Sequence, residues 1–358
     1  MQIKPPGPDC DRPLIVRCGA FGDMVLLTEL IRGLHHRFQC DVDILTSGPW
    51  SKPLLKGQPG VGEIIRVRSR KTPYWLAPDQ RSAVATLRRR GAGPTWYCDD
   101  NEAAKGMLER AGIPSEKVVD AQNYPLLPRE HVIEQWRRMA QIRPAGVRKS
   151  RAPAESDAAP RLPIGSELIV SDQQRADLDS WLRARRLQGA PLILIQVGNK
   201  RTMRRGLKRL AINNKFWPIE RWASVLKQVR ERCPRHTLVL LGTGPEYALN
   251  QEVAAAADVT AISNVADDLP IPRLIALLSR ADGLITVDSG PAHAAAAVAC
   301  PQVVLFGKAS PSLYRPWGTA GADVLVLCGR IDGEPDIRGI SVEDVIAAWD
   351  SLRLRQRQ

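Results

Sequence analysis

The chain has 358 residues, of which 44% are hydrophobic and 25% are charged, a composition that excludes intrinsic disorder and leaves room for about two domains. Its formal net charge of +13 favours an anionic partner, which could be nucleic acid, an anionic membrane surface or a phosphorylated substrate. The basic residues form short clusters that do not alternate with aromatic residues, so no base-stacking surface for nucleic acid is expected.

Seven cysteines are scattered along the chain without a C-x-x-C pair, which indicates reduced thiols and argues against a disulfide framework or a structural zinc site. The N-terminal residues lack the charged and apolar regions of a signal peptide. The longest apolar run, 292–306, falls short of the roughly 20 residues that span a bilayer. We therefore expect a cytoplasmic protein that is at most peripheral at the cytoplasmic membrane.

The first half of the chain alternates strand-like and helix-like segments. An apolar run at 13–16 leads into the glycine-rich turn R-C-G-A-F-G-D at 17–23, and a helical pattern follows from Met24 to Leu34. The further strand-like runs are 42–45, 64–67 and 95–98, and the further helical stretches lie near 79–90, 102–111 and 131–140. Such alternation predicts βαβ units and a mostly parallel sheet.

Residues 143–166 are rich in Pro, Ala, Ser and charges and have no periodicity, so they are expected to form a linker. Alternation then resumes with a helix near 172–186. The strand-like runs that follow are 192–197, 237–241, 284–287 and 303–306, and the helical ones are 219–232, 246–257, 273–281, 289–299 and 342–352.

These patterns predict an α/β protein with two Rossmann-like domains. The N-terminal domain with its linker is expected at 1–166, and the C-terminal domain at 167–340. The last segment, 341–358, contains a helix that could pack back on the N-terminal domain. A ligand cleft is expected between the domains, at the carboxyl ends of the strands.

The first candidate site is the turn G-A-F-G-D at 19–23. Gly19 and Gly22 would let the backbone pass close to a ligand, and Asp23 falls at the start of a helix. The spacing is not the G-x-G-x-x-G fingerprint, which argues against a nicotinamide enzyme. Asp23 could act on a ligand, or it could simply cap the helix.

The second candidate is V-D-S-G-P-A-H at 287–293, between a buried strand and a helix. Ser289 can cap the helix, Gly290 permits close approach, and the exposed N–H groups would form an anion site. His293 falls in the first turn, where it could face the same ligand. The alternative is a well-capped helix with an incidental histidine.

Two further segments follow strands and should reach the same cleft. The basic stretch Lys200 to Arg209 suits phosphates or an acidic acceptor, although it could be a solvated loop. Glu246, in G-T-G-P-E at 242–246, could bind a ribose or could be a first-turn glutamate favoured by the helix dipole.

The D-V-D sequence at 41–43 matches a crude metal-binding pattern, but it lies along a predicted strand and is expected to be structural. The chain has no G-x-S-x-G, H-E-x-x-H or G-x-x-x-x-G-K-[ST] sequence. The hydrolase, zinc-protease and P-loop classes therefore lack support.

In their order and spacing, G-A-F-G-D and D-S-G-P-A-H resemble the motifs of glycosyltransferase family 9, the heptosyltransferases of lipopolysaccharide core assembly and their relatives. The similarity extends to R-E-H-V-I-E-Q-W (129–136), N-K-F-W-P (214–218), L-L-G-T-G-P-E (240–246), the run at 288–307 and P-W-G (316–318). A basic insertion at 200–213, and S-G-P-A-H in place of T-G-L-x-H, depart from the heptosyltransferase pattern.

The resemblance implies a GT-B architecture, in which two Rossmann-like domains with mostly parallel sheets face each other across a cleft. It implies an inverting transfer of heptose from ADP-heptose to a lipopolysaccharide core or similar anionic glycolipid, without a resident metal or other cofactor. Asp23 matches the family's general base. The residues implied to bind the donor are Lys215, which neutralises its phosphates, Glu246, near its ribose, and Asp288, Ser289, Gly290 and His293, with Gly22 and Asn199 beside them.

Other functions stay open on the sequence alone. The chain could be a GT-B transferase that uses a UDP- or GDP-linked sugar, or a sugar-nucleotide epimerase. A nucleotide- or lipid-binding protein on the same scaffold would not need a base at Asp23. A nucleic-acid-binding module is suggested by charge only. Heparin or DNA binding that is fully salt-sensitive, without nucleotide-diphosphate binding, would favour it.

Overall fold

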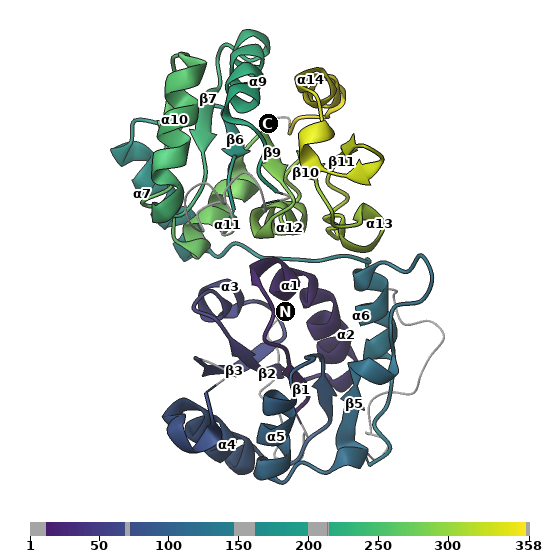
Figure 1. The fold of residues 1–358 in the computed structure, drawn as a ribbon. Coiled ribbons are helices and arrows are strands. Elements are labelled where there is room, and N and C mark those ends of the chain that lie inside the picture. Colours follow the sequence, from purple (N-terminus) through teal and green to yellow (C-terminus); the bar gives the residue numbers. More distant parts are fainter. Residues whose placement is uncertain (1–11, 69–71, 147–161, 200–212, 214, 356–358) are drawn as a thin grey trace. The chain divides into compact units, whose positions relative to one another are not determined.

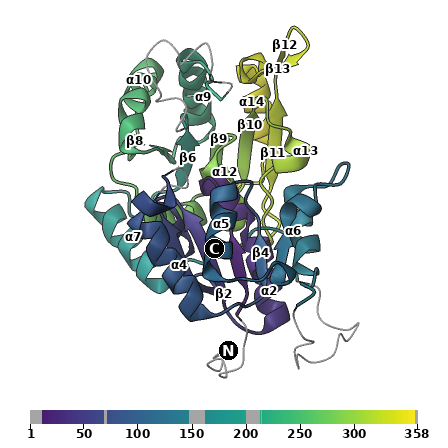
Figure 2. The same cartoon turned by 60° about the horizontal axis from the view of Figure 1, so that its bottom comes forward.

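The computed structural model describes residues 12–68, 72–146, 162–199, 213 and 215–355. The chain divides into two compact units, Met1–Ile164 and Gly165–Gln358. Each unit is an α/β unit built on a parallel sheet, with helices on both faces (Figures 1 and 2). No helix within the described ranges is long and apolar enough to cross a membrane.

The first unit has a five-stranded parallel sheet in the order β3-β2-β1-β4-β5. Its strands are β1 (Leu14–Val16), β2 (Val42–Ser47), β3 (Val61–Val67), β4 (Thr95–Tyr97) and β5 (Val118–Asp120). Its helices are α1 (Phe21–Leu26), α2 (Thr28–Phe38), α3 (Ser51–Leu55), α4 (Pro78–Arg90), α5 (Glu102–Ala111) and α6 (Val132–Ala140), with 3-10 turns η1 (Tyr74–Leu76), η2 (Ser115–Lys117) and η3 (Ala121–Asn123).

Both faces of this sheet are buried. Leu14 and Val16 of β1 pack in one core with side chains of α4 and α5, such as Leu87 and Met107. Ile15, which points to the opposite face because side chains alternate along a strand, is also fully buried. Burial on both faces explains why the sequence shows a continuous apolar run here.

The second unit has a six-stranded parallel sheet in the order β11-β10-β9-β6-β7-β8. Its strands are β6 (Leu192–Gln196), β7 (Thr237–Leu240), β8 (Ile262–Asn264), β9 (Gly283–Val287), β10 (Gln302–Phe306) and β11 (Val324–Cys328), and β12 (Arg330–Ile331) and β13 (Glu334–Pro335) form a small hairpin. Its helices are α7 (Asp172–Ala184), α9 (Ile219–Arg232), α10 (Tyr247–Ala257), α11 (Ile271–Arg280), α12 (Gly290–Ala297), α13 (Pro311–Tyr314) and α14 (Val342–Ser351), with 3-10 turns η4 (Gly244–Glu246) and η5 (Ile337–Gly339).

The β10 strand shows how this sheet is covered. Val303 and Leu305 belong to a large core that includes side chains of α9 and α14, whereas Val304 and Phe306 pack on the other face with Ala292 of α12. Read from β8 to β11, the strand order corresponds to 3-2-1-4-5-6 of a Rossmann fold. The expected pair of Rossmann-like units with mostly parallel sheets is therefore confirmed.

The last helix differs from its expected place. Val345, Ile346 and Trp349 of α14 lie in the core of the second unit, together with side chains of α9. The expectation that this segment packs back on the N-terminal domain was therefore wrong. The reason is its apolar face, which is buried by its own unit.

Other predicted elements needed smaller corrections. The helical pattern from Met24 to Leu34 forms two helices, α1 and α2, joined at Leu27. The strands β5, β8 and β11 were not predicted, and all three lie at sheet edges. The end of the predicted linker is ordered, because Ser166 is buried and forms a β-bridge with Gly318. Residues 147–161 of that linker lie outside the described residues.

Candidate functional site

The second unit places its predicted ligand loops at one edge of its sheet. Strands β6 and β9 are neighbours, with β7 beyond β6 and β10 beyond β9, so the chain order reverses between them. In open parallel sheets, ligands bind at such a switch point, outside the carboxyl ends of the strands. Asn199 follows β6, Glu246 follows β7 and Asp288 follows β9. Three predicted residues thus come from separate loops to one sheet edge.

Lys215 reaches this edge through its ammonium group. Its Nζ lies 2.6 Å from Oδ2 of Asp288 and donates to the carbonyl oxygen of the same residue at 2.8 Å. Its backbone N–H donates to Oδ1 of Asn213 at 3.1 Å, and its carbonyl oxygen accepts from Nδ2 of Asn199 at 3.4 Å. Asp288 is only 6% exposed, and a carboxylate this buried needs a cation or hydrogen-bond donors beside it. The fold therefore holds Lys215 and Asp288 as a pair.

The helix after Asp288 begins at the same edge. Ser289 occupies the N-cap position of α12 in an extended conformation, and Gly290 is the first helical residue. The Ser289 side chain does not cap the helix, because its Oγ lies instead 3.3 Å from Oγ1 of Thr286. The predicted side-chain cap was therefore wrong. His293 is buried near the start of the helix, whose N-terminus carries the partial positive charge that suits an anion.

The Glu246 side chain is buried, and its carboxylate has polar neighbours. Its Oε2 accepts the N–H of Thr243 at 2.9 Å and the hydroxyl of Thr243 at 2.7 Å, and its Oε1 lies 3.3 Å from Nε2 of Gln196. A Cβ atom on Gly198 would come within 2.8 Å of Oε1, so glycine is needed where the β6 loop passes the carboxylate. Burial raises the pKa of the Glu246 carboxyl, and the Thr243 hydrogen bonds oppose the rise. These contacts support the alternative that Glu246 stabilises the first turn after β7. A contact between Glu246 and a ribose stays a prediction.

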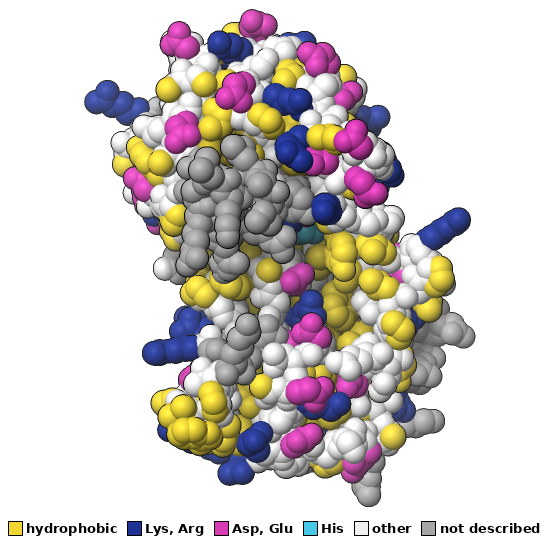
Figure 3. Space-filling view, viewed as in Figure 1, with side chains coloured by type: hydrophobic (Ala, Val, Ile, Leu, Met, Phe, Trp, Pro, Cys, Tyr) yellow, Lys and Arg dark blue, Asp and Glu magenta, His cyan; other side chains and the backbone are white. Residues whose placement is uncertain are grey.

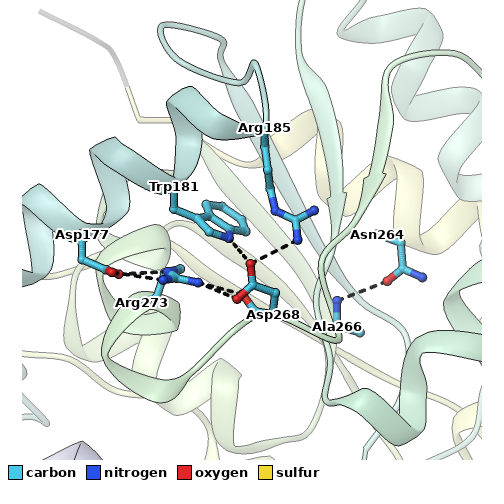
Figure 4. Close-up of polar contacts among 7 residues, drawn as sticks. All are labelled: Asp177, Trp181, Arg185, Asn264, Ala266, Asp268 and Arg273. Atoms are coloured by element: carbon cyan, nitrogen blue, oxygen red, sulfur yellow. Dashed lines mark hydrogen bonds and ion pairs between the residues drawn. The ribbon is translucent and has the colours of Figure 1, made fainter.

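A cluster of charged and aromatic side chains holds the loop after β8 (Figure 4). Asp268 accepts hydrogen bonds from Nε1 of Trp181 and from Nη1 of Arg273, both at 2.8 Å, and from Nη2 of Arg185 at 3.3 Å. Arg273 also donates to Asp177 of α7 at 2.9 and 3.1 Å. The Trp181 hydrogen bond, followed by the arginines, lowers the pKa of Asp268. The cluster fastens this loop to α7 and α11, and no sequence motif predicted it.

The first unit has its own switch point, between β1 and β4. A Cβ atom on Gly19 would lie 2.7 Å from Cβ of Asp23, so glycine is required where the turn meets this residue. Asp23 is the third residue of α1, and its Oδ2 accepts the N–H of Ala20, the N-cap residue, at 2.8 Å. Asp23 is thus not the N-cap, but its carboxylate does hold the helix start. Gly22 lies within the first turn of α1. The role of Asp23 as a base stays a prediction.

Asp99 and Arg17 also belong to this switch point, and neither was predicted. Asp99 is buried directly after β4, and its Oδ2 accepts the N–H of Cys18, in the β1 loop, at 2.6 Å. Its Oδ1 accepts the N–H groups of the next two residues at 3.0 and 3.1 Å. Arg17 donates from Nη1 to the carbonyl oxygen of Cys98 at 2.5 Å. Both residues tie the β1 loop to the β4 loop. The signal for Asp99 was the run D-D-N after a strand.

The D-V-D sequence is structural, as the strand pattern predicts. Asp43 is buried in β2, where its carboxylate accepts from Nε of Arg90 at 2.7 Å and from the N–H of Glu63 at 2.8 Å and also pairs with Arg12. Asp41 lies before the strand and is exposed. Asp43 therefore stabilises the edge of the sheet. The basic stretch Lys200 to Arg209 lies outside the described residues, so its contact with an acceptor stays a prediction.

Comparison with known proteins gives a consistent result. The family model for glycosyltransferase family 9 (heptosyltransferase) matches residues 172–329. Lipopolysaccharide heptosyltransferase 3 of Escherichia coli is 32% identical over 149 residues, which are 38% of this chain and 43% of that protein. Lipopolysaccharide heptosyltransferase 2 of Salmonella typhimurium is 23% identical over 317 residues, which are 85% of this chain and 84% of that protein. The chain thus aligns with less than half of heptosyltransferase 3 and with most of heptosyltransferase 2.

A solved structure extends the similarity to the whole fold. The structure of E. coli ADP-heptose lipopolysaccharide heptosyltransferase II superimposes with a TM-score of 0.71 at 20% identity, covering 95% of this chain and 98% of that one. This likeness confirms the GT-B fold that the sequence motifs imply. Fold, motif order and family model agree: the chain is similar to glycosyltransferase family 9, whose model matches residues 172–329.

Proposed function

We propose that this protein transfers heptose from ADP-heptose to a lipopolysaccharide core or a similar anionic glycolipid, with inversion at the anomeric carbon. The observation that carries the proposal is the Lys215–Asp288 ion pair of 2.6 Å, at the switch point of the second unit and beside the start of α12. The names of the relatives support heptose as the sugar and lipopolysaccharide as the acceptor.

The donor diphosphate would bind where the second unit gathers positive charge. The ammonium group of Lys215 and the N-terminal end of α12, at Ser289 and Gly290, would face the phosphate oxygens. As the diphosphate leaves, its negative charge grows, and preorganised positive groups stabilise that change most in the transition state. His293 and Asn199 would line the same site, and Glu246 would lie towards the ribose. Asp288 would keep the lysine ammonium in place, through the contacts already described.

The acceptor would be activated in the first unit. Asp23 would take the proton from the acceptor hydroxyl as its oxygen attacks the anomeric carbon. The bond from that carbon to the diphosphate oxygen breaks, and ADP leaves with the electron pair. In this scheme no resident metal or other cofactor carries a step. The Ala20 N–H, 2.8 Å from Oδ2 of Asp23, would hold the carboxylate in one orientation and leave Oδ1 for the proton.

A panel of nucleotides tests the donor first. ADP, UDP and GDP share a diphosphate, so only contacts with the base can distinguish them, and an unpaired polar group costs about 1–3 kcal/mol. ADP at about 100 times its dissociation constant should add roughly 2.7 kcal/mol to the free energy of unfolding, which is several degrees of melting temperature. UDP and GDP at the same concentration should shift it less.

A second measurement tests transfer itself. Purified protein with ADP-heptose and a heptose-deficient lipopolysaccharide acceptor should release ADP and lengthen the acceptor by one sugar, which mass spectrometry detects. A larger melting shift with UDP or GDP would contradict ADP-heptose as donor but not glycosyl transfer. A protein that binds ADP without lengthening any acceptor would be a binding protein, and one that converts the free donor without an acceptor would be an epimerase.

A further inference from the structure

The first unit carries an apolar pair that its own core does not cover. Trp75 and Leu76, in the short turn η1 before α4, are 73% and 55% exposed. They are adjacent in the chain, so this one turn presents two large apolar side chains to solvent. Single exposed apolar side chains are common and need no explanation, but a contiguous apolar surface marks an interaction site. The space-filling view shows hydrophobic side chains gathered over this part of the first unit (Figure 3).

Arginines lie close to this pair. Arg81 donates from Nη1 to the carbonyl oxygen of Trp75 at 2.6 Å. The guanidinium of Arg110 stacks on the neighbouring Tyr74, with its carbon 4.7 Å from the ring centroid. Arg88 donates to the carbonyl oxygen of Arg110 at 2.7 and 3.1 Å, through Nη2 and Nε. Arg81 and Arg110 thus contact the turn directly, and Arg88 lies beside Arg110.

The arginines keep their positive charge uncompensated. Within the part of the chain that the structure describes, Arg81, Arg88 and Arg110 form no ion pair with a carboxylate, and all three are exposed. The acid at the start of α4, Asp79, accepts the backbone N–H of Arg68 at 2.5 Å. The surface around Trp75 is therefore positive and apolar at once.

We propose that Trp75, Leu76 and these three arginines dock the protein on an anionic membrane surface. Tryptophan is enriched at membrane–water interfaces because its ring is apolar and its N–H is polar. Arginines beside an inserted apolar group bind the anionic lipid headgroups. The net charge of +13 adds long-range attraction to such a surface. A protein partner would also need an acidic surface, and it is an outcome of the test. Membrane docking does not depend on which sugar donor the protein uses. It rests on the proposed function only in that a lipid-linked acceptor would lie at such a membrane.

Vesicle flotation tests the surface without any turnover. The full chain should float with vesicles of phosphatidylcholine and 30% phosphatidylglycerol, and not with pure phosphatidylcholine. Because each basic residue near such a surface contributes about 1 kcal/mol, the double variant Arg88→Ser/Arg110→Ser should bind about 30-fold more weakly. The variant Trp75→Ser/Leu76→Ser should lose about tenfold or more, because it removes the inserted apolar area.

Matched variants control for charge and for hydrophobicity in general. Arg183→Ser/Arg353→Ser removes two exposed arginines elsewhere, and Leu127→Ser/Ile331→Ser removes two other exposed apolar side chains. Both should bind vesicles as the unchanged protein does, and melting temperatures should show that all variants are folded. Binding that is equal for neutral and anionic vesicles, or equally weakened in the control variants, would overturn the proposal.

A final readout separates this surface from the acceptor site. With a soluble, delipidated acceptor, Trp75→Ser/Leu76→Ser should transfer sugar at the unchanged rate, whereas transfer to vesicle-bound acceptor should fall. Loss of both would place these residues in acceptor binding instead. If no variant, including the unchanged protein, transfers sugar, the proposed function fails while the vesicle result still stands. Capture of an acidic protein with no vesicle binding would replace the membrane by a protein partner.

Discussion

The two units have the same strand topology at their switch points, yet they use the acid after the fourth strand differently. In the first unit, Asp99 follows β4 and accepts a backbone N–H from the β1 loop, at 2.6 Å from the nitrogen of Cys18. In the second unit, Asp288 follows β9 and pairs with the Lys215 ammonium, also at 2.6 Å. The topology therefore puts an acid in the loop after the fourth strand of both units. The group that pairs with this acid determines which ligand the loop suits.

The difference fits two kinds of ligand. A carboxylate that accepts backbone N–H groups fixes the loop that carries Asp23, which the first unit would present to a neutral hydroxyl. A carboxylate that holds a lysine keeps a cation at the sheet edge, which suits a diphosphate. We therefore expect substitutions in the first unit to change transfer and loop stability, and substitutions in the second to change donor affinity.

The largest effect should follow Asp23→Asn. Removal of a positioned general base costs about 10²–10⁴-fold in rate, whereas the asparagine side chain can still accept the Ala20 N–H. The turnover number for transfer should fall by that factor, and the ADP dissociation constant, measured by calorimetry, should not change. Asp41→Asn replaces an exposed aspartate of the same unit and should leave both unchanged. Near-normal transfer by folded Asp23→Asn would show that this residue is not the base.

Asp99→Ala should act on the first unit's loops. The substitution takes the acceptor away from three backbone N–H groups, including that of Cys18, and each buried group left unpaired costs about 1–3 kcal/mol. The free energy of unfolding, from urea titration, should fall by roughly 2–4 kcal/mol, and transfer should fall because the Asp23 loop loosens. ADP affinity should be unchanged. Glu116→Ala, at an exposed glutamate, is the control. Loss of ADP binding in Asp99→Ala would contradict the assignment of donor binding to the second unit.

Lys215→Met should weaken donor binding and, to a smaller extent, the stability of the second unit. A hydrogen bond to a charged group is worth about 1.5–3 kcal/mol, so the ADP dissociation constant should rise by about 10–100-fold. The Asp288 carboxylate also loses its cation, so the melting temperature should fall, and Lys215→Met/Asp288→Asn should recover part of it. Lys227→Met removes an exposed lysine of α9 and should do neither. An unchanged ADP dissociation constant in Lys215→Met would move the donor site elsewhere.

The sequence predicted the central strands because burial on both faces leaves a continuous apolar run, as in L-I-L-I-Q of β6 and Q-V-V-L-F of β10. It did not predict β5 and β8, which have three residues each, or the edge strand β11. A short edge strand is covered on fewer sides and carries less apolar signal, so its pairing depends on a neighbour far away in the chain.

In the candidate site, the sequence predicted which residues lie in the loops but not which residues they contact. The loop that follows a strand lies at the carboxyl edge of a parallel sheet, which is why Asn199 and Asp288 could be placed from the sequence. The partner of such a residue cannot be read in this way. Lys215 precedes Asp288 by 73 residues, and Asp99 reaches back to the β1 loop over 81. These contacts depend on the packed fold.

The smallest expected effect is a difference in the pH dependence of stability between two acids, Asp268 and Glu246, in neighbouring loops of the second unit. The pKa of Asp268 is lowered by the Trp181 hydrogen bond and by its arginines, so its ionised form stabilises the fold. That stability is present above the ordinary carboxyl pKa and is lost as pH falls through the lowered value. Because the side chain is 49% exposed, Asp268→Asn should cost under about 1 kcal/mol at pH 7, and the cost should vanish in acid.

Glu246 should behave in the opposite way. Burial raises the pKa of its carboxyl, so the fold favours the protonated form, and ionisation destabilises it as pH rises above the ordinary value. Glu246→Gln mimics the protonated form and should gain stability relative to the unchanged protein as pH rises from 4 to 7. Urea midpoints at several pH values between about 3 and 7 measure both variants. Parallel pH profiles for Asp268→Asn and Glu246→Gln would contradict the opposite environments that the structure gives these two acids.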